Sequence, residues 1–80
     1  MNYRALISTD PKIMLGKPCI IGTRITVDAI LEDLAAGQPE SELLASYPRL
    51  TREGIHAALA YAAAMVRNEV FEPAPQLAAA

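Results

Sequence analysis

The sequence predicts a mainly α fold in which three helices follow a short N-terminal β-hairpin. Three segments between residues 26 and 69 carry apolar side chains at intervals of three and four, and Gly37 and Pro48 separate these segments. Upstream, the stretch from Gly16 to Val27 combines two glycines and a proline with β-branched residues, which is typical of turns between short strands. In a chain of 80 residues we expect one domain over residues 1–66 and a tail over residues 67–80 that is flexible or ordered by a partner.

The hairpin is expected to contain one strand over residues 13–15 and a return strand over residues 18–21, joined by a turn at Gly16 and Lys17. Pro18 has no backbone N–H to donate, so it should stand at the beginning or the edge of its strand. A hairpin of this length is unstable alone in water, and we expect it to rest on the helices that follow.

Further local features flank the hairpin. Gly22 permits a positive φ angle, and residues 1–9 could form a short strand that pairs with its copy in a second chain. Arg24 either anchors the fold through carboxylates or carbonyls or offers a cation to a partner; we favour the structural anchor, because isoleucines flank it. Cys19 is expected to be a buried hydrophobe, since no histidine lies near it in the sequence to lower its pKa.

Capping residues indicate the first two helices. The hydroxyl of Thr26 can accept a hydrogen bond from a free backbone N–H, so a helix should follow over residues 27–36. Gly37 should end that helix in the left-handed conformation. Pro39 is expected at the first position of the second helix, residues 39–46, where its missing N–H costs nothing.

Thr51 should cap a third and longer helix over residues 52–69. One apolar stripe is expected to face the core, made of Ile55, Ala58, Leu59, Ala62, Met65 and Val66. The other faces of the helix are rich in alanine, and a second packing surface, in a homodimer or on a partner protein, would account for them. The strong helix propensity of alanine is the simpler explanation. We expect a homodimer, because a chain this small has a thin core.

Charge is distributed unevenly along the chain, although the net charge is only −2. Residues 1–25 carry four basic residues and one acid, residues 26–46 carry five acids and no base, and residues 47–67 carry three bases and one acid. The middle segment would repel phosphate, so any contact with DNA should involve the hairpin and the start of the third helix.

The order of helix, short turn and helix predicts a three-helix homeodomain-like or winged helix-turn-helix domain, in which the third helix enters the major groove by its N-terminal turn. The residues expected to contact DNA are Lys12, Lys17, Arg49, Thr51, Arg52 and His56. Seven cations in a chain with nine acids would bind weakly in a monomer, and a dimer would double the contacts.

Enzymatic chemistry is not expected. His56, the single histidine, should lie on the exposed side of the third helix, where a surface role or a phosphate contact is more common than general base catalysis. No motif indicates a metal, a cofactor or a nucleophilic residue with its base. The chain has no N-terminal signal segment and no run of eighteen apolar residues, so we expect it in the cytoplasm.

A set of short motifs also resembles a known family. The motifs are Gly16-Lys17-Pro18, Ile20, Gly22-Thr23-Arg24-Ile25, Ala36-Gly37 and Tyr47-Pro48-x-Leu50-Thr51. This pattern, within a resemblance from about Ile7 to about Val66, closely resembles the bacterial family catalogued as domain of unknown function 433. The resemblance implies a small helix-turn-helix domain with an N-terminal β-hairpin, and such proteins look like antitoxins, often encoded beside a PIN-like ribonuclease toxin.

On this basis the chain is predicted to be a type II antitoxin that neutralises a PIN-like ribonuclease toxin and represses its own promoter. In the tail, Arg67 would offer a cation to toxin carboxylates, and Phe71, with Val70 beside it, would anchor in an apolar pocket. The alternative prediction is a homodimeric protein-interaction module of the same fold that neither binds DNA nor catalyses a reaction.

Overall fold

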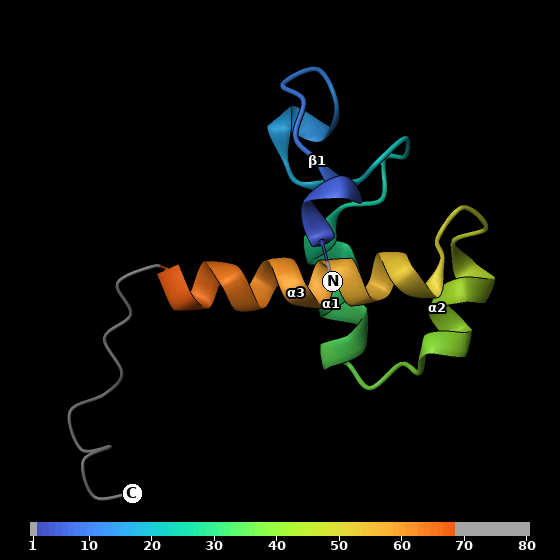
Figure 1. The fold of residues 1–80 in the computed structure, drawn as a ribbon. Helices are drawn as coiled ribbons and strands as arrows, with labels where there is room; N and C mark the ends of the chain where they lie inside the picture. The colour runs from blue at the N-terminus through green and yellow to red at the C-terminus, as the bar shows by residue number, and fades with distance from the viewer. Residues whose placement is uncertain (1, 69–80) are drawn as a thin grey trace, which may run out of the picture.

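The computed structural model describes residues 2–68, and the elements in this part of the chain follow a mainly α order (Figure 1). They are the 3₁₀ helix η1 (Tyr3–Ala5), strand β1 (Ile7–Ser8), the 3₁₀ helix η2 (Met14–Gly16), strand β2 (Cys19–Ile20), and the helices α1 (Val27–Ala35), α2 (Glu40–Ser46) and α3 (Arg52–Asn68). The prediction of three helices with a short N-terminal antiparallel sheet is confirmed.

The partner of strand β2 differs from the prediction. Strand β2 pairs in antiparallel fashion with β1, so that Ile7 lies opposite Ile20. The predicted strand over residues 13–15 is wrong, because Met14 and Leu15 have φ angles of 50° and 59°, in the left-handed region, which no extended strand adopts. The short strand predicted within residues 1–9 is β1, which pairs with β2 of the same chain, whereas residues 3–5 form the 3₁₀ helix η1.

After strand β2 the chain turns back tightly on itself. Gly22 has a φ angle of 74°, as its sequence position predicted. The Thr23 hydroxyl donates to the carbonyl of Ile20 at 2.7 Å and accepts from the N–H of Ile25 at 3.0 Å. These bonds hold the loop rigidly and direct residue 24 to the outside of the turn.

The helix boundaries follow the predicted caps closely. Thr26 accepts a hydrogen bond from the N–H of Ala29 at 3.2 Å, and Gly37 has a φ angle of 93°. Two boundaries differ from the prediction by a single residue. Helix α1 ends at Ala35, one residue earlier than predicted, and Pro39 is the N-cap of α2 and not its first helical residue. Its ψ angle of 161° is extended, and its carbonyl accepts the N–H of Leu43, as an N-cap carbonyl does.

The core lies where the three helices meet. Ile30 of α1, Leu43 of α2 and Ile55 of α3 are completely buried there, and Ile20 of β2 packs against them. Cys19 is buried too, as expected.

The buried face of α3 was predicted only in part. Ile55 and Ala58 are buried as expected, but the predicted core residues Leu59, Met65 and Val66 are 45, 39 and 68 % exposed. Ala57 and Ala64, which were not predicted to face the core, are buried instead. Both α1 and η1 pack against α3, and Figure 1 shows α1 crossing it steeply. Small side chains allow this close approach, so alanine is buried where two elements cross.

None of the described helices is both long enough and apolar enough to cross a bilayer.

Candidate functional site

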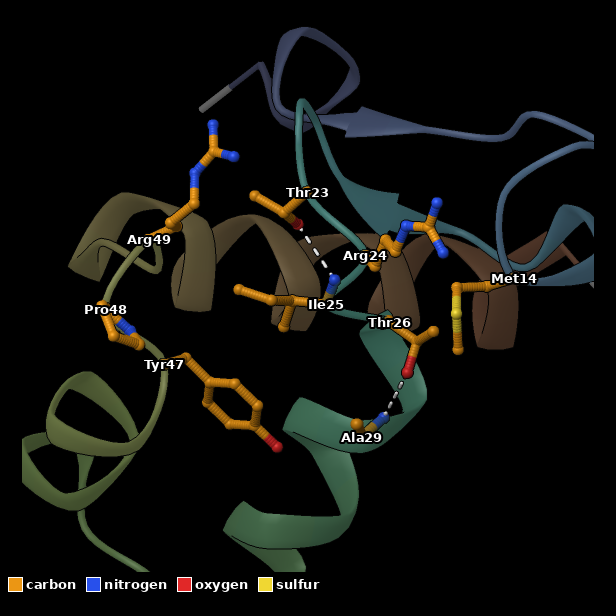
Figure 2. A pocket seen from close by; sticks show the side chains of 9 residues that line it. All are labelled: Met14, Thr23, Arg24, Ile25, Thr26, Ala29, Tyr47, Pro48 and Arg49. Atoms are coloured by element: carbon orange, nitrogen blue, oxygen red, sulfur yellow. Dashed lines mark hydrogen bonds between the residues drawn. The ribbon is translucent and has the colours of Figure 1, made fainter.

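An open groove of about 410 Å³ lies between the turn that follows β2 and the turn that precedes α3 (Figure 2). The first turn contributes a wall through Thr23, Arg24 and Ile25, and the second contributes a wall through Tyr47, Pro48 and Arg49. The remaining lining residues are Met14, Thr26 and Ala29. Among the described residues, no acidic side chain lines this groove.

Hydrogen bonds hold both walls of the groove in place. The loop from residue 23 to residue 26 is fixed by the Thr23 and Thr26 bonds described above, which are drawn in Figure 2. On the opposite wall, the Tyr47 hydroxyl donates to Oδ2 of Asp33 in α1 at 3.1 Å. Burial, and secondly this bond to Asp33, raise the pKa of the Tyr47 hydroxyl. The phenol therefore stays protonated at neutral pH and ties the second turn to α1.

The two arginines of the groove are exposed, and neither makes an ion pair or a side-chain hydrogen bond with another residue in the described range 2–68. No contact within residues 2–68 shows the predicted role of Arg24 as a structural anchor, and that role stays a prediction. The tight turn at Gly22 and Thr23 leaves the Arg24 side chain exposed. The Arg49 guanidinium lies close to Gly22, where an added Cβ would be 3.8 Å from Nη2. Figure 2 shows the two guanidinium groups on opposite sides of Thr23.

The start of α3, which was also predicted to contact DNA, lies against Glu40 of α2. The sequence did not predict this contact. Nε of Arg52 lies 3.2 Å from one carboxylate oxygen of Glu40, and Nε2 of His56 lies 3.5 Å from the other. Thr51 uses its hydroxyl to accept the N–H of Gly54 at 3.0 Å, which caps α3 as predicted. We call Glu40, Arg52 and His56 the Glu40 cluster. All three side chains are partly exposed to solvent.

The predicted DNA-binding lysines lie in the N-terminal part of the chain. Lys17 forms an ion pair with Asp28 at 3.4 Å, whereas Lys12 is exposed in the loop between β1 and η2. Figure 1 shows that this loop projects away from α3, so the structure does not gather the six predicted residues onto one surface. Of the predicted partner-binding residues, Arg67 is exposed in the last turn of α3, and Val70 and Phe71 lie outside the described residues.

Other reactive groups offer little chemistry. Burial raises the pKa of the Cys19 thiol, with a smaller contribution from the charge of Asp28, so the thiolate is disfavoured. Within residues 2–68, no group of three or more histidine, cysteine, aspartate or glutamate side chains is placed to hold a metal ion.

The sequence of residues 47–50 indicates only a turn, so the groove was not predicted. One signal was available: no acid occurs between residues 18 and 27 or between residues 43 and 52, the two segments that hold Arg24 and Arg49. That signal does not show that the two segments meet.

The three helices, the short turn between α2 and α3 and the small antiparallel sheet define a small domain of helix-turn-helix type. Within that class, the chain belongs to the family described as protein of unknown function (DUF433), whose sequence profile matches residues 7–62.

Two similar proteins place the chain in context. It is 33 % identical over 76 residues to the uncharacterized protein y4eO of Sinorhizobium fredii (strain NBRC 101917 / NGR234). The matched region covers 91 % of this chain and 34 % of that protein. The chain thus spans about a third of the length of this curated relative. It also resembles the crystal structure of a DUF433 member protein from Anabaena variabilis ATCC 29413, with a TM-score of 0.69 and 36 % identity over 79 % of this chain and 59 % of that chain.

Proposed function

We propose that this chain is a cytoplasmic, homodimeric type II antitoxin, which binds a PIN-like ribonuclease toxin and represses its own promoter by binding DNA. The observation that carries the DNA-binding part is the arrangement of α2 and α3 around the turn at residues 47–51. This turn leaves Thr51, Arg52 and Glu53 exposed at the start of α3, with the exposed Arg49 just before them. An exposed helix N-terminus with flanking arginines can approach a phosphate backbone or a groove of DNA.

The Glu40 cluster sets the strength of this interaction. For Arg52 to contact DNA, it must exchange the carboxylate of Glu40 for a phosphate or a base edge. Exposed ion pairs are weak, so the exchange costs little, but the acid remains near the DNA and repels it. Arg49 makes no such pair within the described residues and can contact phosphate directly.

The toxin-binding part is supported by the C-terminal half of α3. Leu59, Met65 and Val66 are large apolar side chains that the fold leaves exposed, and Arg67 follows them. Exposed apolar residues along a single helix, ending in a cation, suit a groove on a partner protein.

The second candidate function is a homodimeric protein-interaction module that binds no DNA. One observation favours it: Glu40 pairs with both Arg52 and His56, two of the residues predicted to contact DNA. In this function the start of α3 is a surface stabilised by its own charges, and the exposed face of α3 carries the activity.

Fluorescence anisotropy separates these two functions. A labelled duplex from the upstream region of the gene is titrated with the protein at two salt concentrations, beside a scrambled duplex. The antitoxin proposal expects tighter binding to the native duplex, a steep loss of affinity with salt, and weaker binding by Arg49→Ala and Arg52→Ala. Absence of binding at low salt would remove the repressor role and favour the protein-interaction module.

Toxin binding requires a separate test, because it does not depend on DNA. The neighbouring nuclease is expressed with the intact chain, with the chain truncated after Met65, or with Val66→Ser. We expect the truncation to abolish neutralisation and Val66→Ser to weaken it, since both remove exposed apolar surface of α3. Undiminished neutralisation by the truncated chain would rule out the tail as the toxin contact.

A further inference from the structure

We propose that the groove between Arg24 and Arg49 binds residues 69–72 from a second copy of this chain. The proposal concerns self-association. Because it uses Arg49 and residues 70 and 71, this association would compete with the proposed contacts to DNA and to the toxin. It is based on the charge and the apolar surface of the groove, on the sequence of the segment, and on the distance that the segment can reach.

The groove combines an apolar surface with two cations that have no ion-pair partner within residues 2–68. Ile25, Ala29 and Pro48 supply apolar surface, and the guanidinium groups of Arg24 and Arg49 stand at its edge with no acid among the lining residues. Of the other cations in the described part of the chain, Lys12 and Arg67 are exposed outside the groove with no ion-pair partner among these residues, and three are engaged. Lys17 pairs with Asp28, Arg52 pairs with Glu40, and Arg4 lies 5.3 Å above the ring of Tyr3. Two free arginines beside apolar surface fit a ligand that has carboxylates next to apolar side chains.

Residues 69–72, which lie outside the described residues, have this composition. Their sequence is Glu-Val-Phe-Glu, so that two carboxylates flank a valine and a phenylalanine. Each glutamate can pair with one arginine of the groove, and the aromatic ring can cover the apolar surface between them. No other segment of the chain places two acids around two adjacent apolar residues that include an aromatic ring.

The segment must come from another copy because of its reach. The groove lies at the end of α3 where the helix begins, beside Arg49, and the 17 residues of α3 span about 25 Å before Asn68. The four residues from Asn68 to Glu72 extend at most about 14 Å, so they fall short of the groove in their own chain. If each copy inserts its segment into the groove of the other, the exchange closes at two chains with two-fold symmetry.

The test measures self-association of the full chain by sedimentation equilibrium. One variant carries Arg24→Glu and Arg49→Glu, and a second carries Glu69→Arg and Glu72→Arg. We expect each variant alone to lose association by at least about tenfold, since like charges then face each other, and an equimolar mixture to regain it as a heterodimer. Phe71→Ser should weaken association, and so should added salt.

A matched control carries Arg4→Glu and Lys12→Glu, which change the charge by the same amount outside the groove and should leave association unchanged. Circular dichroism melting verifies that each variant is folded. A wild-type chain that stays monomeric, charge reversals without effect, or a mixture that fails to associate would each overturn the proposal. Duplex DNA binding that is lost with Arg24→Gln and Arg49→Gln, while association is retained, would assign the groove to nucleic acid instead.

Discussion

Asp28 shows how a single carboxylate joins two parts of the fold. Its side chain follows the N-cap of α1 and pairs with Lys17, which precedes β2. A hydrogen bond from Thr26 is the main cause that lowers the pKa of Asp28. Burial, the second-largest effect, raises this pKa, and the hydrogen bond and charge of Lys17 lower it further. Acid near the start of a helix is also favoured by the helix dipole.

This pKa shift gives a prediction about acid stability. Because the folded-state pKa lies below the unfolded value, Asp28 contributes stability above about pH 4 that is lost as the pH falls through the lower, folded-state pKa. Urea unfolding of Asp28→Asn should therefore show a shallower loss of stability below pH 4 than the wild type. Lys17→Gln should reproduce only part of this change, since Thr26 makes the larger contribution. Identical pH profiles for Asp28→Asn and the wild type would contradict this assignment.

Leu15 is a second residue where local conformation has a measurable cost. It is 94 % exposed and has a φ angle of 59° between two other left-handed residues. Asparagine tolerates this conformation better than leucine does. We expect Leu15→Asn to raise the free energy of unfolding by about 0.5–1 kcal/mol, measured by chemical denaturation. Ile21→Asn, at an exposed site whose φ angle is not positive, should give no such gain, and equal effects of the two would argue against backbone strain.

At the scale of a single element, α3 buries mostly small side chains and exposes larger apolar ones. Its buried face is made of Ile55 and small residues, and its larger apolar residues face outward. Truncating Ile55 to alanine should cost about 2–5 kcal/mol, whereas truncating Leu59, which is nearly half exposed, should cost less than about 1.5 kcal/mol. Thermal and urea unfolding of the two variants test this ranking, and a Leu59→Ala variant as unstable as Ile55→Ala would place Leu59 in the core.

The end of α1 depends on one backbone conformation. Gly37 has a φ angle of 93°, its N–H donates to the carbonyl of Leu34, and an added Cβ would meet no atom within 4 Å. The cost of Gly37→Ala is therefore conformational and should be about 1 kcal/mol in urea unfolding. Gly37→Asn should lose less, since asparagine adopts positive φ more readily. A neutral Gly37→Ala would mean that the turn relaxes to another conformation.

At the scale of the whole molecule, the groove and the Glu40 cluster flank the same turn, residues 47–51. The groove leaves two arginines without an acid, and the Glu40 cluster supplies an acid to Arg52 and His56. Opposite charges are thus separated over a short stretch of surface. Any negatively charged partner would be attracted to the groove and repelled by Glu40.

For the proposed DNA binding this separation predicts the effect of Glu40→Gln. Removing the carboxylate frees Arg52 and removes repulsion of phosphate, so duplex affinity should rise several-fold at low salt, in the anisotropy titration described above. Glu42→Gln makes the same charge change on the same helix without breaking an ion pair seen within the described residues. Equal gains from both variants would reflect net charge alone. A loss of affinity in Glu40→Gln would mean that Glu40 positions Arg52 for DNA.

The sequence was a good guide wherever a structure depends on neighbouring residues. Thr26, Gly37 and Thr51 mark helix ends through hydrogen bonds or φ angles that involve residues within about one turn, so they were recognised correctly. The pairing of the strands was harder to predict from the sequence, because Ile13, Met14 and Leu15 have the composition of a strand although the chain turns there. The candidate groove was not predicted, since its two walls lie about 24 positions apart in the sequence.

The sequence by itself therefore determined the mainly α fold class, the three helices, the caps of α1 and α3, and membership of the family. Only the tertiary structure decided that β1 pairs with β2, that alanines rather than Leu59 face the core from α3, and that Arg24 and Arg49 border one groove while Glu40 holds Arg52. The physical reason is range. Caps and propensities act over three or four residues, whereas strand pairing, helix crossing and ion pairs between helices depend on which distant segments approach each other.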